Sequence, residues 1–170
     1  MYSTLRSYQY LTGPANRQER VLKRNQSAGD IVSALLMAVR VSLPKTRVMA
    51  EKFRRRTPEE TALAVYDFMR KNYIYRKESS ANQTAKTLPR ILHDSRNGTT
   101  GDCKHYSTTA ATIFKALGMP VYFRVIDQVG RWNHIYTVVK YPGGREIIVD
   151  GTYPYFNRET NYNKKTDIPV

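Results

Sequence analysis

The sequence predicts an α+β fold, in which N-terminal helices precede a central cysteine-bearing helix that packs on a small antiparallel sheet. Apolar residues recur at helical spacing between residues 30 and 118, whereas they alternate with a period of two between residues 121 and 150. Helices followed by a run of strands, rather than interleaved with them, are typical of this class. With 170 residues the chain can form one domain without disulfides or metal.

Residues 1–26 show no sustained apolar period and are rich in Tyr, Arg, Gln and Asn. We expect a basic, Tyr-rich N-terminal arm that lies outside the catalytic fold, along the domain surface or against a partner. Residues 27–157 then form the domain, and residues 158–170 a polar C-terminal tail. Because Tyr and Arg are favoured at interfaces, the arm is where we expect a macromolecular assembly partner to bind.

The first helix of the domain is predicted to begin at Asp30 and to be bounded by Pro44. Its apolar residues at helical spacing are Ile31, Leu35, Leu36 and Val39. A short second helix is expected over residues 45–53. A third begins at Thr57, which can cap it, and Glu60 can complete a capping box. The inward stripe of this third helix is expected to be Leu63, Tyr66, Met69 and Tyr73.

The segment before the cysteine is expected to be mostly irregular. Residues 76–88 are polar, residues 87–92 are expected to form a short turn of helix, and residues 96–101 are rich in turn formers. A helix then begins at Cys103 and ends at Gly118. Its buried stripe is predicted to be Tyr106, Ala110, Ile113, Phe114 and Leu117.

The last part of the domain is predicted to be an antiparallel meander of strands. The strands are expected over Val121–Asp127, His134–Tyr141 and Arg145–Asp150. Turns that contain Gly130 and Pro142-Gly143-Gly144 join them. The second turn brings the end of the third strand back to the start of the second.

Cys103 is the single cysteine of the chain and therefore cannot form an internal disulfide. At a helix start, unpaired N–H groups and the helix dipole favour a thiolate. The same N–H groups would face the oxygen of a tetrahedral intermediate. The alternative is that Cys103 is a small buried hydrophobic residue. Gly101 and Asp102 favour the first interpretation, because they place the thiol at a loop–helix junction.

A histidine and an acid stand at the edges of the predicted strands. His134 begins one strand and Asp150 ends its neighbour across the hairpin, so the two side chains can meet. Taken singly, His134 could be a surface histidine at a strand end, and Asp150 a turn former before Gly151. Together with Cys103, in the chain order Cys, His, Asp, they indicate an activated thiol nucleophile.

Further residues are candidates for the walls of the site. Asn97 is a candidate for a second donor to the oxyanion. His105 lies two residues after Cys103 and does not share its helix face, so we interpret it as local or substrate-facing. Trp132 and Tyr153 are candidates for the wall of the substrate cleft.

A metal site is the alternative use of the same polar residues. Zinc could be held by Cys103, His105, His134 and Asp150. The sequence has no paired-ligand motif such as CxxC or HExxH, so we expect no metal and no other cofactor.

The net charge of +14 arises from 28 Lys and Arg against 14 Asp and Glu. Such a chain is attracted to polyanions, so a polyanion contact is expected, although no nucleic-acid-binding motif is present. No secretory signal is visible at the N-terminus. The longest apolar run, 31–43, contains Arg40 and is too short to cross a bilayer. We therefore expect no membrane span, and a cytoplasmic or virion-associated protein.

The motifs, taken in chain order, resemble the transglutaminase-like superfamily within the papain-like cysteine enzymes. The resemblance covers about residues 57–157. It rests on Thr87-Leu88, Gly101-Asp102-Cys103-Lys104, Ala116-Leu117-Gly118-Met119-Pro120, Asn133-His134-Ile135-Tyr136 and Ile148-Val149-Asp150-Gly151-Thr152. It implies a Cys103–His134–Asp150 triad. Small bacterial and phage-encoded members are similar, which implies a mobile-element or virion origin.

Two positions depart from the pattern of those relatives. His105 stands where they often have an acid, and Gly151 where Pro is frequent. Neither change removes a group of the triad, so both bear on the substrate.

The resemblance implies a cysteine-dependent acyl-transfer enzyme that acts on amide or peptide bonds of a protein or peptide. We favour hydrolysis over crosslinking because water as acceptor needs fewer special features. The alternatives are a non-catalytic structural or protein-binding module of the same fold and a polyanion or nucleic-acid binder.

Overall fold

A computed structural model describes residues 2–15, 19–22, 26–79 and 81–170, and confirms the α+β class. The helices are α1 (Tyr2–Thr12), α2 (Ala28–Glu51), α3 (Pro58–Asn72), α4 (Leu88–Arg96), α5 (Cys103–Ala116) and the short 3₁₀ helix η1 (Pro142–Gly144). The strands are β1 (Glu19–Leu22), β2 (Gln83–Lys86), β3 (Val121–Asp127), β4 (Trp132–Lys140), β5 (Glu146–Val149) and β6 (Lys164–Pro169).

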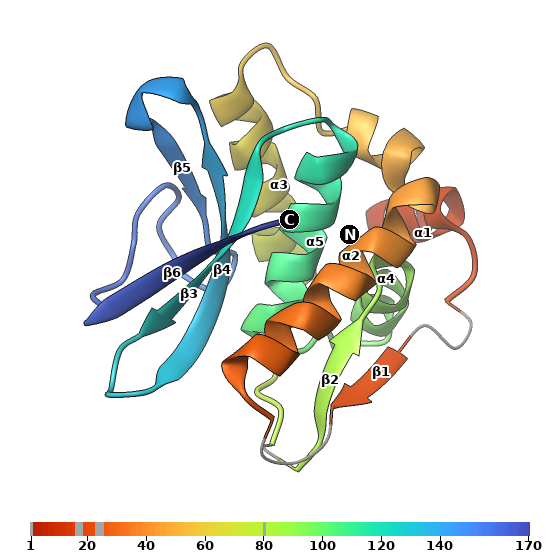
Figure 1. Ribbon diagram of the computed structural model, residues 1–170. Helices are drawn as coiled ribbons and strands as arrows, with labels where there is room; N and C mark the ends of the chain where they lie inside the picture. Colours follow the sequence, from red (N-terminus) through yellow and green to blue (C-terminus); the bar gives the residue numbers. More distant parts are fainter. Residues whose placement is uncertain (1, 16–18, 23–25, 80) are drawn as a thin grey trace.

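Helix α5 lies in the middle of the molecule, with a four-stranded sheet on one side and α1, α2 and α4 on the other (Figure 1). The strands of this sheet have the order β5-β4-β3-β6, and each pair of neighbouring strands is antiparallel. Strands β1 and β2 form a separate antiparallel pair beside α2. The predicted stripe of α5 is buried, and so is nearly every other residue of this helix.

A helix buried on all sides must satisfy its own polar side chains. Each of four hydroxyls donates to the carbonyl four residues earlier: Ser107 to Cys103, Thr108 to Lys104, Thr109 to His105 and Thr112 to Thr108. Two contacts link α5 to β4. The Ser107 hydroxyl shares its one hydrogen between the carbonyls of Cys103 and Ile135, and Thr137 Oγ1 donates to the Ser107 carbonyl. The start of α5 is thereby fixed against the strand that carries His134.

The hairpin of β4 and β5 confirms the predicted meander and brings His134 and Asp150 to one end of the sheet. Thr137 is paired with Val149, so His134 and Asp150 both lie just beyond this pair in the same direction. Strand β3 has the predicted bounds, whereas β4 and β5 differ from theirs by one or two residues at each end.

The predicted end of a helix at Pro44 is wrong, because α2 continues through it to Glu51. Proline removes one helical hydrogen bond. Here it lies on the exposed side of α2, where water can solvate the freed carbonyl. Buried side chains on both sides of it, including Leu35 and Met49, hold the two halves in one helix.

Residues 1–26 are not simply an extended arm outside the fold. They contain α1, whose Leu5 belongs to the main hydrophobic core, and β1, which pairs with β2. Tyr8 of α1 stacks on Phe53 and meets the edge of Phe68. The predicted boundary at residue 26 therefore does not separate an unpacked segment from the core.

Two smaller expectations also differ from the structure. Residues 158–170 are not a free tail, because β6 pairs with β3 in the sheet. Leu63 of the predicted α3 stripe is 39% exposed. The buried face of α3 is instead rotated toward Ala62 and Val65, and it keeps Tyr66, Met69 and Tyr73.

Arg124 occupies the centre of the sheet face that is turned away from α5. Its guanidinium donates to Asp167 of β6, Glu146 of β5 and Glu159 of the loop that precedes β6. Tyr136 of β4 also donates to Glu159, at 2.7 Å. One buried cation thus ties together the strands and the loop that covers them.

Within the described ranges, no helix is both long enough and apolar enough to cross a membrane.

Candidate active site

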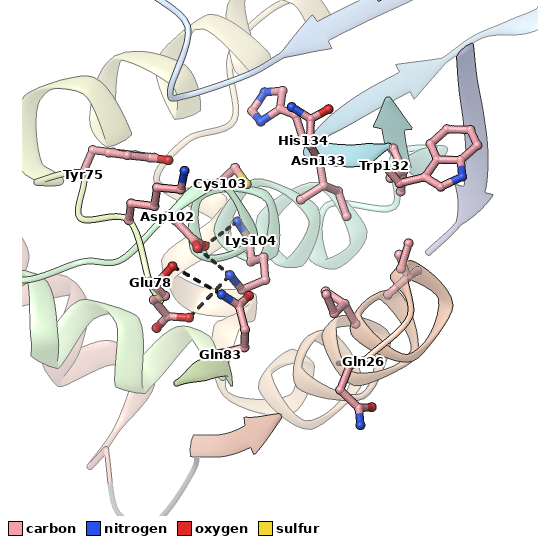
Figure 2. A pocket seen from close by; sticks show the side chains of 16 residues that line it. Gln26, Tyr75, Glu78, Gln83, Asp102, Cys103, Lys104, Trp132, Asn133 and His134 are labelled. Atoms are coloured by element: carbon pink, nitrogen blue, oxygen red, sulfur yellow. Dashed lines mark hydrogen bonds and ion pairs between the residues drawn. The ribbon is translucent and has the colours of Figure 1, made fainter. Parts of the chain in front are cut away.

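A cavity of about 250 Å³ lies at the N-terminal end of α5. Its walls come from the start of α2, the segment after α3, the start of α5 and the start of β4. Figure 2 shows Cys103 and His134 on this cavity, with Trp132 and Asn133 on one side and Tyr75 and Glu78 on the other. The site is therefore assembled from segments far apart in the sequence.

Cys103 is the first residue of α5 and is half-buried, with its side chain on the cavity. Asp102 precedes it as the N-cap and accepts a hydrogen bond from the N–H of Lys104 at 3.2 Å. The N–H of Cys103 belongs to the first turn, where backbone donors have no partner inside the helix. The thiol thus lies where the helix favours negative charge.

His134 and Asp150 form a short hydrogen bond beside Cys103. His134 Nε2 and Asp150 Oδ2 are 2.6 Å apart, and the His134 side chain is 15% exposed. The other ring nitrogen, Nδ1, is then the one that can exchange a proton with the thiol. No hydrogen bond of standard geometry joins thiol and imidazole among the described residues, which fits a site without substrate.

The surroundings of His134 favour its protonated form. Burial on its own lowers the pKa of His134. The hydrogen bond to Asp150, the interaction of the ring with the Cys103 thiol and the charges of both groups outweigh burial, and the pKa rises to about 10. The imidazole next to the thiol is therefore positioned to hold a proton at neutral pH.

Asp150 is buried and is fixed by bonds to the residues around it. Burial raises its pKa, but the bond to His134, the charge of His134 and two bonds from Thr152 lower it below the usual value. Thr152 donates to Oδ1 through its N–H at 2.9 Å and through its hydroxyl at 2.7 Å. A Cβ on Gly151 would come within 2.7 Å of Tyr106, so glycine lets this turn pack against α5.

The segment after α3 places Tyr75 opposite His134. Tyr75 forms an isolated bridge with Gly101, and the N–H of Arg76 donates to the Gly101 carbonyl at 2.9 Å. Burial, followed by the charge of Cys103, raises the pKa of Tyr75. Figure 2 shows its hydroxyl directed toward Cys103. Tyr75, which the sequence did not mark as a site residue, thus brings a hydroxyl toward Cys103.

Below the thiol, two carboxylates hold Lys104. Its ammonium lies 2.5 Å from Asp102 Oδ2 and 3.4 Å from Glu78 Oε2. Glu78 also accepts hydrogen bonds from the N–H and the hydroxyl of Thr84 in β2. Burial raises the pKa of Asp102, but bonds to His105 and Lys104 more than compensate and lower it. This network fixes the turn from which Cys103 projects.

The interpretation of His105 as substrate-facing is wrong, because its side chain is fully buried and does not line the cavity. Its Nδ1 accepts from the N–H of Asp102 at 3.2 Å, and its Nε2 lies 3.2 Å from Thr84 Oγ1. A Cβ on Gly101, whose φ is +123°, would lie 2.2 Å from the ring. His105 therefore braces the turn before Cys103, and only glycine fits against it.

Of the other residues that were expected in the walls of the site, one lines the cavity and two do not. Trp132 lines the cavity. Asn97 does not: it is exposed, and its amide donates to the His93 carbonyl at 3.0 Å, so the structure does not support it as an oxyanion donor. Tyr153 also lies outside the lining, where its carbonyl accepts from the Tyr66 hydroxyl.

The four residues of the alternative zinc site do not gather, because His105 is turned away from the other three. A different group of ligand-type side chains lies together: Glu78, Asp102 and His105 have ligand atoms within 4.8 Å of one another. The carboxylates of this group already bind the ammonium of Lys104.

The sequence did not mark three residues near the site: Tyr75, Glu78 and Lys104. Lys104 follows the cysteine directly and could have been identified, but its two carboxylate partners depend on tertiary structure. Tyr75 and Glu78 lie in a polar stretch without periodicity, where no local pattern marks a site residue.

The chain is similar in sequence to one protein family and in fold to a solved structure. The model of the transglutaminase-like superfamily matches residues 47–150. A candidate cysteine protease from Cytophaga hutchinsonii has a TM-score of 0.53 at 20% identity, and the match covers 79% of this chain and 49% of that one. A crystal structure of a TGase has a TM-score of 0.48 at 18% identity, over 82% of this chain and 37% of that one. No curated protein matches.

The chain therefore spans about half, or less, of the length of these solved structures. At such low identity, the likeness to the first of them shows the fold alone.

Proposed function

Because the chain belongs to the transglutaminase-like superfamily, we propose that it is a cysteine-dependent acyl-transfer enzyme acting on amide or peptide bonds. The observation that carries the proposal is the 2.6 Å bond between His134 and Asp150 beside Cys103, on one cavity. A thiol, an imidazole and an orienting carboxylate are the groups that nucleophilic acyl transfer needs.

In the first half of the reaction, the Cys103 thiolate attacks the carbonyl carbon of the amide. A sulfur–carbon bond forms and the carbonyl electron pair moves onto oxygen. The N–H of Cys103 and the Tyr75 hydroxyl are the donors proposed for this oxyanion. When the intermediate collapses, the carbon–nitrogen bond breaks, and the leaving amine takes the proton that His134 holds.

In the second half, neutral His134 removes a proton from water as the water attacks the thioester. When this second intermediate collapses, the carbon–sulfur bond breaks, the carboxylic acid leaves, and Cys103 returns as the thiolate beside protonated His134. Asp150 keeps the ring oriented in both halves through Nε2. We favour water over an amine as acceptor because hydrolysis needs no second binding site.

A protein or peptide is the proposed substrate. The cavity of about 250 Å³ accepts a group of side-chain size, and it is open to solvent beside Trp132. Apolar residues from the start of α2 and polar residues around Glu78 line opposite walls. An extended segment can therefore present one side chain while its backbone runs over Cys103.

The proposal is tested by the pH dependence of iodoacetamide labelling, which needs no knowledge of the substrate. We expect native Cys103 to be alkylated at about pH 6, at least about tenfold faster than free cysteine, because imidazolium and helix dipole favour the thiolate. His134→Gln should lose this reactivity, and Asp150→Asn should weaken it. His93→Gln is the matched control, because His93 is a surface histidine.

Equal pH profiles for the wild type and His134→Gln would contradict the proposal. So would a native protein that is not labelled at any pH while the unfolded chain is. Either result favours a non-catalytic module of the same fold.

A further inference from the structure

The side of α2 that faces away from α5 carries an exposed apolar row. Met37, Val41 and Val48 are 50%, 47% and 60% exposed, and Pro44 between them is exposed as well. Exposed apolar residues are ordinary when they are scattered. Here they share one face of one helix, separated by four, three and four residues.

This spacing is that of the a and d positions of a heptad repeat, with Val41 and Val48 at a and Met37 and Pro44 at d. The row spans 12 residues, about 18 Å at the rise of an α-helix. It matches about two heptads of a second helix laid along α2. The residues of α2 that pack on the domain lie on its other faces.

Four of the residues that flank the row are basic, whereas Ala38, at the first e position, is buried. Arg40 and Arg47 occupy the g positions beside it, and Lys45 and Lys52 the later e positions. All four are exposed, and among the described residues none lies within ion-pair distance of a carboxylate. In helix pairs, the e and g positions select the partner by charge. We call the row and its four flanking cations the α2 outer face.

We propose that the α2 outer face is a docking surface for an amphipathic helix with apolar a and d residues and acidic e and g residues. The apolar row supplies the buried contact, and the cations supply the specificity. Because the domain holds α2 in its helical form, this side of the complex is ordered before binding, which lowers the cost of association.

Charge argues against a second copy of this chain as the occupant. Two outer faces laid together would place Arg and Lys opposite Arg and Lys. Shape argues against a lipid surface: the row is one residue wide, and its side chains are Met, Val and Pro rather than the Trp, Phe and Leu typical of interfacial helices.

The test uses the full chain and three synthetic peptides of three heptads each. The first has Leu at a and d and Glu at e and g. The second replaces these Glu residues by Lys, and the third keeps Glu but has Ser at a and d. We expect the first peptide to bind, at least about tenfold more tightly than the other two, as measured by fluorescence anisotropy.

Variants locate the binding to α2. Val41→Ser combined with Val48→Ser should weaken the binding of the first peptide at least about tenfold. Val129→Ser, at a 65% exposed site in a turn, should leave this binding unchanged. Arg40→Glu combined with Arg47→Glu should abolish the binding of the first peptide and allow the second peptide to bind. Arg145→Glu combined with Arg158→Glu, an equal charge change at exposed sites elsewhere, should do neither.

Equal binding of the first and third peptides would overturn the proposal, because charge alone would then suffice. Binding that survives the α2 substitutions would place the contact elsewhere. If phosphatidylserine vesicles bind the chain through the same residues while the first peptide does not bind, the occupant is a lipid surface and the proposed partner is wrong.

Discussion

His134 is the residue whose protonation connects the local structure to the proposed chemistry. The ordinary pKa of a histidine is about 6.5, so this ring would be mostly neutral above pH 7 if it were exposed to water. Here Asp150 and Cys103 raise its pKa to about 10 despite burial. The leaving amine can therefore be protonated over the whole neutral and mildly alkaline range.

We predict that His134 does not titrate between pH 6 and 8 in the native protein. Its imidazole signal should shift near pH 10, as measured by NMR, with His134→Gln to identify the signal among three histidines. Asp150→Asn should lower the pH of this transition toward the ordinary value for histidine. The substitution removes the carboxylate whose hydrogen bond and charge raise the pKa of His134 against the effect of burial. A wild-type transition near pH 6.5 would contradict the arrangement of the triad.

The raised pKa of His134 also determines how the stability of the folded state depends on pH. A histidine with a raised pKa stabilises the folded state fully below its unfolded value of about 6.5. This contribution is lost as the pH rises through about 10. The pair of His134 and Asp150 therefore contributes to the stability of the folded state at neutral pH.

At the scale of elements, the sequence predicted the parts that follow from local periodicity. The α5 stripe, the capped start of α3 at Thr57 and the meander from Val121 were all readable, because each shows an uninterrupted pattern with a clear start signal. The predicted helix end at Pro44 is wrong because sequence alone does not show that this proline lies on the exposed side of a helix.

The elements that were missed obtain their stability from distant partners. Strand β6 has a polar sequence, and its place in the sheet depends on Arg124 and on pairing with β3. Helix α1 has a mixed composition, and Leu5 is buried only because α2 and α4 lie beneath it. The site shows the same division. The approach of His134 to Asp150 beside Cys103 could be predicted from motif order, but His105 and Asn97 could not be oriented without their neighbours.

Among the residues of α1 whose side chains the structure describes, Leu5 is the deeply buried apolar one, so it must contribute to stability. Leu5→Ala should lower the free energy of unfolding by about 2 to 4 kcal/mol, because the buried side chain leaves a cavity. Tyr10→Ala, on the same helix but 86% exposed, should change it by less than about 0.5 kcal/mol. Urea denaturation measures both. Neutral effects of both would restore the interpretation of this segment as an arm.

At the scale of the whole molecule, Arg124 links strands that are distant in the sequence. Its side chain is 1% exposed and binds three carboxylates. Removing one partner of a buried ionic cluster leaves uncompensated charge inside the protein.

Arg124→Gln should therefore lower the free energy of unfolding by about 3 to 5 kcal/mol, measured by urea denaturation. Lys140→Gln is the matched control. Lys140 also pairs with Glu146 and Asp167, but its side chain is 32% exposed, so the loss should stay below about 1 kcal/mol. Similar losses in the two variants would mean that the cluster acts through surface charge rather than as a buried link.

Because α5 is buried on nearly every side, its backbone opens to solvent only slowly. Amide protons in the most enclosed helix of a domain exchange with solvent only through large-scale opening. Cys103 is the first residue of that helix, and its carbonyl accepts from the Ser107 hydroxyl, which also binds β4, so its backbone is tied to this enclosed element. The adaptable parts of the cavity are then its outer walls around Tyr75 and Trp132, both about half exposed. A substrate would meet a nucleophile that does not shift and walls that can.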